Sequence, residues 1–242
     1  IIEENQKYFE VIQRNLSQYI KNDSQNEDNI ILKRLLLKKL QEKPNMLYNQ
    51  ILSWVFVQEE SFNSAFAQEK AIFKRGEIKD YGRLFDLAEI MTEAKEYEIA
   101  QDTYKFIIEE SKKLQNTLRA VELYMDIRIL RNDEASDIKQ EFIDRLQQYG
   151  YNAQTLGLQL LYAEFLAFNL NLWEDAKQLL SNAINFETNR FMEAKVQMLL
   201  ADILVAQELF NQALVKYSLV SKRVKNTPLA QQAKYKTAMA SY

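Results

Sequence analysis

Pairs of adjacent carboxylates are the residues of this chain whose spacing comes nearest to a catalytic pattern. They occur as Glu59-Glu60, Glu109-Glu110 and Asp133-Glu134. Two carboxyl groups held about 5–10 Å apart in a pocket, one of them desolvated, could supply the acid and the base of glycoside hydrolysis. These three pairs are expected at turns or on charged helix faces. We therefore interpret them as solvated helix ends.

The chain contains no His and no Cys, which excludes several kinds of site. Zinc ligation by Cys or His, haem ligation by His, and nucleophiles activated by His all require these residues. The four glycines are isolated, at Gly76, Gly82, Gly150 and Gly157, so no Gly-rich phosphate loop exists. We expect no metal, no cofactor and no enzyme activity. A Ser–Lys or all-carboxylate site is the enzymatic alternative.

The composition favours helices joined by short turns. Of 242 residues, 47% are hydrophobic and 27% are charged, enough for a sizeable core with a soluble surface. Only four Gly and two Pro occur, and the Asn-Gly and Asp-Gly signals of tight β-hairpins are absent. No apolar run approaches the roughly 18 residues of a transmembrane helix. The prediction is an all-α fold.

One short phrase recurs along the chain: an aromatic residue followed three positions later by Ala. It appears at Phe62–Ala65, Tyr97–Ala100, Trp173–Ala176 and Phe210–Ala213, and the alanines are 35, 76 and 37 residues apart. Ala135 would divide the long step into 35 and 41. Steps of this length are typical of a two-helix repeat, in which a small residue just past the turn lets the paired helices approach.

These residues resemble the tetratricopeptide (TPR) repeat family. Its pattern has a small residue in the first helix of a pair, an aromatic opening the second, and Ala three later. The two units that match best supply Ala88, Tyr97, Ala100, Tyr104 and Ile107, and Ala201, Phe210, Ala213, Tyr217 and Val220. The resemblance covers most of residues 46–227 and is poorest over 116–150. The resemblance implies an α-α superhelix, a solenoid of stacked antiparallel helix pairs.

Both ends of the chain extend this array. Residues 1–45 are expected to form one more pair, with helices at 1–22 and 26–43, and residues 228–242 the first helix of another. This gives about six pairs in a single repeat domain over residues 1–242. The chain starts at Ile1 without Met and ends at Tyr242 inside an expected helix, which indicates a piece of a longer protein.

Charge is distributed unevenly along the chain. Residues 77–144 carry 17 acidic and 10 basic side chains, a net of −7, and residues 190–242 carry 3 acidic and 8 basic, a net of +5. The simple interpretation is uneven solvated faces, and the sharper one is steering of a charged partner. Basic clusters occur at Lys33-Arg34, Lys38-Lys39 and Lys222-Arg223. We expect no nucleic-acid partner, because the pI is about 5.4 and the acidic middle would repel phosphates.

The family resemblance also implies a binding groove lined by the first helices. The groove positions transferred from the family are Gln50, Trp54, Gln58, Phe85, Glu89, Glu93, Leu161, Phe165 and Phe168. Large aromatics on a rigid surface make good interface anchors. The alternative for each residue is packing against the next repeat. The family's clamp for a terminal carboxylate has no match here.

The function predicted from the sequence is a non-enzymatic scaffold that binds a partner protein or peptide on its concave face. One alternative is a structural segment of a larger protein whose groove is filled by its own chain, and another is a bacterial repeat domain that senses a ligand or peptide. The Asn-, Lys- and Ile-rich composition is typical of an AT-rich bacterium. We favour the bacterial envelope over the cytoplasm, and leave the partner and the oligomeric state open.

Overall fold

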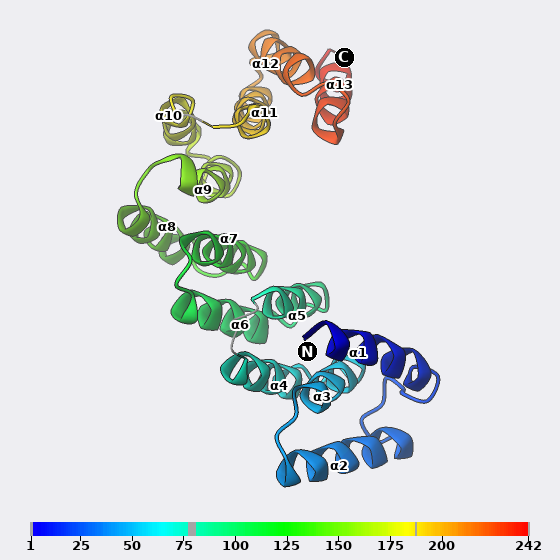
Figure 1. Cartoon of the computed structure of the whole chain (residues 1–242). Coiled ribbons are helices and arrows are strands. Elements are labelled where there is room, and N and C mark those ends of the chain that lie inside the picture. Colours follow the sequence, from blue (N-terminus) through cyan, green and yellow to red (C-terminus); the bar gives the residue numbers. More distant parts are fainter. Residues whose placement is uncertain (1, 77–80, 187, 242) are drawn as a thin grey trace. The chain divides into compact units, whose positions relative to one another are not determined.

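The computed structural model describes residues 2–76, 81–186 and 188–241, and every regular element in these ranges is a helix (Figure 1). The prediction of an all-α fold is confirmed. Ile1 and Tyr242 lie outside the described residues. The helices are α1 (Ile2–Leu16), α2 (Glu27–Glu42), α3 (Met46–Gln58), α4 (Phe62–Arg75), α5 (Gly82–Glu93), α6 (Tyr97–Glu110), α7 (Leu114–Leu130), α8 (Ala135–Tyr149), the 3₁₀ turn η1 (Ala153–Thr155), α9 (Leu156–Phe168), α10 (Trp173–Ala183), α11 (Arg190–Ala206), α12 (Phe210–Arg223) and α13 (Pro228–Ala240).

Consecutive helices pack as antiparallel pairs, and the pairs stack. The chain forms two compact units, residues 1–112 and 113–242, each described by itself. In the first unit α3 packs on α4 and α5 on α6; in the second, α9 packs on α10, and α11 on α12. In the described ranges no helix is both long and apolar enough to cross a membrane. The arrangement within each unit is that of an all-α helical repeat.

The recurring alanines lie where the paired helices approach each other. Each of the four second helices α4, α6, α10 and α12 begins on the aromatic residue of the repeated phrase. The alanine three residues later has no exposed surface in any of them, and these are Ala65, Ala100, Ala176 and Ala213. A methyl group is the largest side chain that such a close helix crossing accepts without displacement. The predicted role of these alanines is confirmed.

The turns of these four pairs share one backbone conformation. A residue with φ between 55° and 63° stands two positions before each second helix, and these residues are Glu60, Lys95, Asn171 and Glu208. The residue that follows has φ between −91° and −83° and ψ between 55° and 63° in all four. A left-handed residue after a helix is the usual device for reversing the chain, and Gly normally supplies it. In this chain Glu, Lys and Asn adopt the left-handed conformation, which explains how the turns form with so little glycine.

The α7–α8 pair departs from the others, and the predicted register there is wrong. Helix α8 begins at Ala135, so Ala135 stands where the other second helices have their aromatic, not where they have Ala. Ile138, which is 1% exposed, takes the place of the buried alanine. With this correction the second helices start at residues 62, 97, 135, 173 and 210, a regular spacing of 35 to 38. The bulkier Ile138 explains why α7 and α8 approach less closely than the other pairs.

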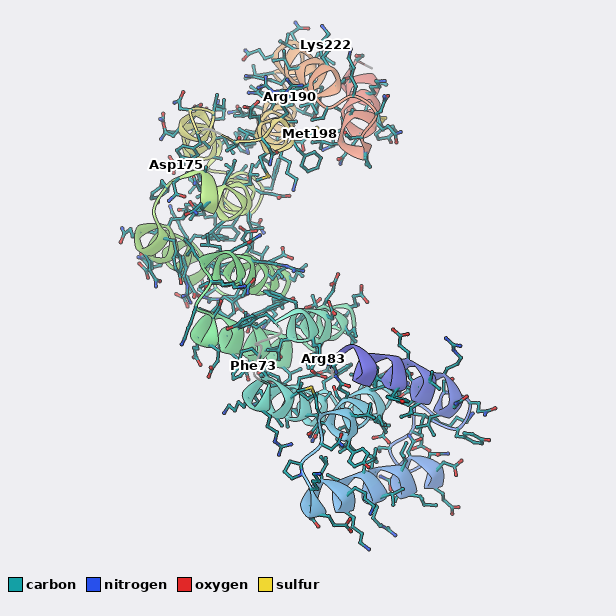
Figure 2. All side chains as sticks on the ribbon, viewed as in Figure 1. Phe73, Arg83, Asp175, Arg190, Met198 and Lys222 are labelled. Atoms are coloured by element: carbon teal, nitrogen blue, oxygen red, sulfur yellow. The ribbon has the colours of Figure 1, made fainter. Side chains whose placement is uncertain are left out.

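Aromatic side chains fill the first unit between α4 and α6. Phe73 of α4, labelled in Figure 2, has its ring centroid 5.5 Å from that of Phe106 in an edge-to-face arrangement. Arg83 of α5, also labelled there, reaches back to Glu69 of α4 through two hydrogen bonds of 2.8 and 2.5 Å. Such two-point pairing fixes the orientation of both side chains.

The first two helices differ from the later pairs. Helix α1 ends at Leu16, earlier than the predicted residue 22, and ten residues separate it from α2. Helix α2 keeps nearly the predicted bounds and is capped by the Asn26 side chain, which accepts a hydrogen bond from the backbone N–H of Asn29. Both helices contact α3, with Phe9, Ile12 and Leu16 of α1 packing on its core cluster. Helix α1 therefore covers part of α3.

Candidate functional site

All nine residues predicted to line a groove lie on first helices, α3, α5 and α9, but they do not form one accessible surface. Phe85 is 3% exposed and has its ring centroid 6.2 Å from that of Tyr104 on the paired helix. Phe165 is 2% exposed and has its ring centroid 5.8 Å from that of Phe142 on α8. These two residues belong to the core, which corrects their expected place at an accessible surface.

Helical phase explains this correction. A shift of one residue turns a side chain by about 100° around the helix axis. On α9, Phe165 continues the buried stripe of Leu158 and Tyr162, at spacings of four and three. The neighbouring stripe runs through Gly157, Leu161, Glu164 and Phe168 and includes two of the predicted positions.

In the first unit the face of α3 is covered in part by α1. Trp54 and Gln58 line an open hollow of about 490 Å³ together with α1 residues that include Gln13 and Arg14. Trp54 also packs against the cluster to which α1 contributes its apolar side chains. The third α3 residue, Gln50, is partly buried, with its Oε1 atom buried and unpartnered in the described part of the chain. This face is thus partly filled by the chain itself.

Glu89 and Glu93 both lie on the solvent side of α5, where both are exposed. They are four residues apart, which places them one above the other on the same side of the helix. The structure therefore brings Trp54 and Gln58 together at one hollow and leaves this acidic pair on the surface of α5.

In the second unit, Leu161 and Phe168 lie on an accessible stripe of α9. Leu161 is partly buried and Phe168 is 45% exposed. The stripe starts at Gly157, where α7 comes very close: a Cβ atom at this position would clash with the carboxyl group of Glu122. The absence of a side chain at Gly157 thus leaves room for the Glu122 carboxyl group beside α9.

Three carboxyl groups gather along this stripe, and each has a raised pKa. Burial raises the pKa of Glu122, against the opposing effects of a hydrogen bond from the backbone N–H of Leu158 and the charge of Lys195. Burial also raises the pKa of Asp126, one helical turn further along α7. Loss of hydration disfavours the charged form of a carboxyl group, which is why both values rise.

Glu164 is the third of these groups and the one most influenced by neighbouring acids. Burial raises its pKa first, and the charges of Asp126 and Asp202 raise it further, whereas Lys236 lowers it. Asp202 of α11 is itself balanced, because it accepts hydrogen bonds of 2.6 Å from both Lys236 Nζ and the hydroxyl group of Tyr217. In the described part of the chain, Asp126 and Glu164 make no ion pair.

We call this surface the acidic face and define it by Glu122, Asp126, Leu161, Glu164 and Phe168. The charge of Lys195 partly offsets that of Glu122, whereas neither Asp126 nor Glu164 has an ion-pair partner among the described residues, so the unbalanced negative charge is centred on these two. Carboxylates that are partly dehydrated and close to one another attract cations strongly. An exposed aromatic ring beside them offers apolar contact area. The surface is suited to binding a segment that carries both Lys or Arg and apolar side chains.

The three pairs of adjacent carboxylates noted in the sequence are not part of the acidic face. Glu59 is buried, pairs with Lys33 at 2.8 Å and accepts a hydrogen bond of 2.9 Å from Asn29. Glu60 is exposed and accepts one of 3.0 Å from Asn22. Asp133 pairs with Arg128 at 3.0 Å, and Glu134, Glu109 and Glu110 are exposed. Within the described ranges no group of three or more acidic residues could hold a metal ion.

Sequence reasoning missed the acids of the acidic face. Its only available signals were the net charge of −7 over residues 77–144 and the four-residue spacing of Glu122 and Asp126. Neither signal places these residues against α9.

Comparison with known proteins gives this chain no relative, since no family model, no curated protein and no solved structure matches it. The class of protein is defined by the fold alone: an all-α helical-repeat protein built of stacked antiparallel helix pairs. The resemblance to tetratricopeptide repeats remains an interpretation of the sequence.

Proposed function

We propose that this chain is a non-enzymatic scaffold that binds a segment of a partner protein on the acidic face. The observation that carries the proposal is the gathering of Glu122, Asp126 and Glu164, each with a raised pKa, beside the exposed ring of Phe168. The proposed partner segment carries Lys or Arg residues that pair with the carboxylates and an apolar residue that packs on Phe168. TPR resemblance is consistent with such a role, although fold does not fix function.

Binding of a basic segment would relieve the energetic cost of this surface. The raised pKa values mean that the folded chain resists ionisation of these carboxyl groups. A bound ammonium or guanidinium group would favour the ionised forms, so binding should release protons near the raised pKa values. Affinity should weaken as salt rises, since the attraction is largely between partly exposed charges.

The test is affinity capture from an extract of cells that make the protein, comparing charge-reversed variants. The test variant carries Asp126→Lys and Glu164→Lys. The control carries Glu98→Lys and Glu109→Lys, which make the same charge change at exposed positions of α6. Circular dichroism and urea unfolding establish that both variants are folded.

We expect a partner retained by the wild type and by the control, and lost by the test variant. With the purified partner, Phe168→Ala should weaken binding by about tenfold, as for an aromatic anchor. A partner that binds the test variant and the wild type equally would overturn the proposal. Phe165→Ala is unsuitable here, because it would empty a core position.

A second candidate function concerns the first unit and rests on the position of α1. This helix packs on the face of α3 that carries Trp54, so the corresponding surface of this unit is partly filled in cis. We propose that this unit has a structural role as the start of the array. Removal of residues 1–16 should then lower the free energy of unfolding. If it leaves stability unchanged and creates a new binding activity, α1 is a regulatory cover instead.

A further inference from the structure

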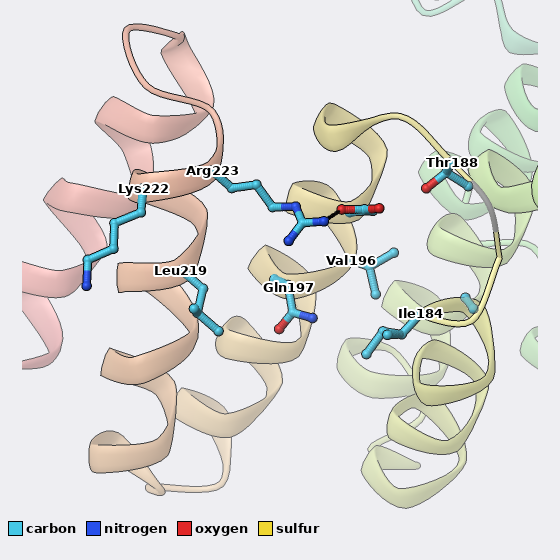
Figure 3. Close-up of a pocket in the computed structure, with 9 residues that line it drawn as sticks. Ile184, Thr188, Val196, Gln197, Leu219, Lys222 and Arg223 are labelled. Atoms are coloured by element: carbon cyan, nitrogen blue, oxygen red, sulfur yellow. Dashed lines mark ion pairs between the residues drawn. The ribbon is translucent and has the colours of Figure 1, made fainter.

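A cavity of about 370 Å³ lies in the second unit between the end of α10, the start of α11 and the end of α12 (Figure 3). Its volume is within the range of about 300–1,000 Å³ that is usual for ligand sites. Val196 forms a buried wall, while Ile184 and Leu219 are 43% and 47% exposed. The cavity thus combines one buried apolar residue, Val196, with two large apolar side chains that are open to solvent.

This cavity is separate from the acidic face. Its α11 residues, Glu193 and Gln197, are four positions apart and lie on one side of the helix. Lys195 and Asp202, whose charges act on the carboxyl groups of the acidic face, are about half a turn away around the same helix. The cavity therefore opens on the opposite side of α11.

One polar atom inside the cavity lacks a partner. The Oε1 atom of Gln197 is buried and accepts no hydrogen bond from the described part of the chain. Leaving a buried acceptor unpaired is costly, and an N–H group of a ligand would relieve that cost. Figure 3 shows the Gln197 amide between Leu219 on one side and Val196 on the other. A bound N–H group would thus lie next to the side chains of Leu219 and Val196.

One basic side chain, that of Arg223, lies at the opening. Arg223 forms an ion pair with Glu193, drawn as a dashed line in Figure 3, but its side chain is 51% exposed and keeps further N–H donors free to bind an anion. Lys222 is exposed and makes no ion pair within the described residues, but Figure 3 shows its ammonium group pointing away from Arg223 and Gln197. Residues 190–242 as a whole carry a net charge of +5. An acidic ligand would be attracted to this site.

We propose that this cavity is a second peptide-binding site, specific for an acidic segment that carries one apolar side chain. The apolar side chain lies on Val196 between Ile184 and Leu219. A backbone N–H of the segment donates to Gln197 Oε1, and a neighbouring carboxylate pairs with Arg223. This site prefers the opposite charge to the acidic face and does not depend on the function proposed there.

The test is an NMR titration of the whole chain with the N-acetylated, C-amidated peptide Asp-Glu-Leu-Glu-Asp. We expect saturable shifts of the Ile184 and Leu219 methyl groups and of the Gln197 side-chain amide. The peptide Asp-Glu-Gly-Glu-Asp should bind at least about tenfold more weakly, because it lacks the apolar side chain. The peptide Lys-Lys-Leu-Lys-Lys should not shift these resonances. Absence of saturable shifts with the first peptide up to millimolar concentrations would overturn the proposal.

Two variants separate binding from folding. Arg223→Gln should weaken binding about tenfold, whereas Lys234→Gln, which also removes one positive charge, at an exposed position of α13, should alter it less than about twofold. Gln197→Leu removes the unpaired oxygen, so it should fold at least as stably as the wild type yet bind the peptide more weakly. Equal weakening by Arg223→Gln and Lys234→Gln would indicate general charge attraction and refute a site at the cavity.

Discussion

Asn29 of α2 donates a hydrogen bond from Nδ2 to Oε1 of Glu59, at 2.9 Å, and so ties α2 to the end of α3. The same carboxylate pairs with Lys33 at 2.8 Å, and its side chain has no exposed surface. Glu59 thus neutralises a cation and satisfies a buried amide. In the absence of a tight turn between α1 and α2, this polar contact helps to hold the first helices on the array.

We predict that Glu59→Gln lowers the free energy of unfolding by about 1–3 kcal/mol, because it removes the charge that pairs with Lys33 in a buried setting. The adjacent Glu60→Gln is the matched control, since Glu60 is exposed, and it should change stability by less than about 0.5 kcal/mol. Urea unfolding measures both. Equal effects of the two substitutions would show that burial of Glu59 does not matter.

We predict that the buried alanines cannot be enlarged. Ala213→Leu or Ala100→Leu should destabilise the fold by about 1–3 kcal/mol through overpacking. Ala67→Leu, at an exposed position of α4, is the control and should be close to neutral. At the equivalent site of α8 the preferred side-chain size is larger: Ile138→Ala should destabilise by about 2–5 kcal/mol, because it leaves a cavity. If Ile138→Ala stabilised the protein, the corrected register of α8 would be refuted.

We predict that glycine improves the left-handed turn positions. Glu208 has φ 61°, a conformation that is strained for residues with a Cβ atom. Glu208→Gly should therefore raise the free energy of unfolding by about 0.5–1 kcal/mol. The neighbouring Gln207, with φ −89°, is the control, and Gln207→Gly should not stabilise. Thermal or urea unfolding of the pair distinguishes relief of strain from a general effect of glycine.

Much of the fold could be predicted because it depends on the local spacing of residue types along the chain. The buried alanines follow from a repeated phrase, and most helix bounds follow from apolar periodicity. The turns were predicted to be short. Their left-handed residues are Glu, Lys and Asn, so no glycine in the sequence indicated which positions take this conformation. The register of α8 was missed because its first residue is Ala135, a residue type that elsewhere marks the buried position.

The candidate site was less predictable, because it depends on contacts between helices. A difference of about 60° in helical phase decides whether an aromatic residue of α9 is core, like Phe165, or surface, like Phe168. The carboxyl groups of Glu122 and Glu164 come from different helices. Burial raises the pKa of both, and the charges of Asp126 and Asp202 raise that of Glu164 further. Sequence separation carries no information on that proximity.

The last prediction concerns the pKa of Glu164, which two substitutions should move in opposite directions. Asp126→Asn removes a negative charge and should lower the raised pKa, whereas Lys236→Gln removes a positive charge and should raise it further. NMR titration of the side-chain carboxyl carbon follows each value. Because Lys236 also pairs with Asp202, whose charge raises the same pKa, Lys236→Gln additionally frees that charge to act in the same direction.

The stability consequence has a definite sign. A carboxyl group with a raised pKa in the folded state binds its proton more tightly there than in the unfolded chain. The stability it contributes is complete below the ordinary value of 4.5 and is lost as pH rises through the raised pKa. Glu164→Gln keeps the neutral form at every pH, so it should be slightly more stable than the wild type at pH 7, and this advantage should vanish below pH 4.5. Because Glu164 is exposed on one side, the gain should be only a few tenths of a kcal/mol. A variant less stable than the wild type at pH 7 would mean that Glu164 stabilises the fold as a charged group, and only Asp126 would then remain as an unbalanced carboxylate of the acidic face.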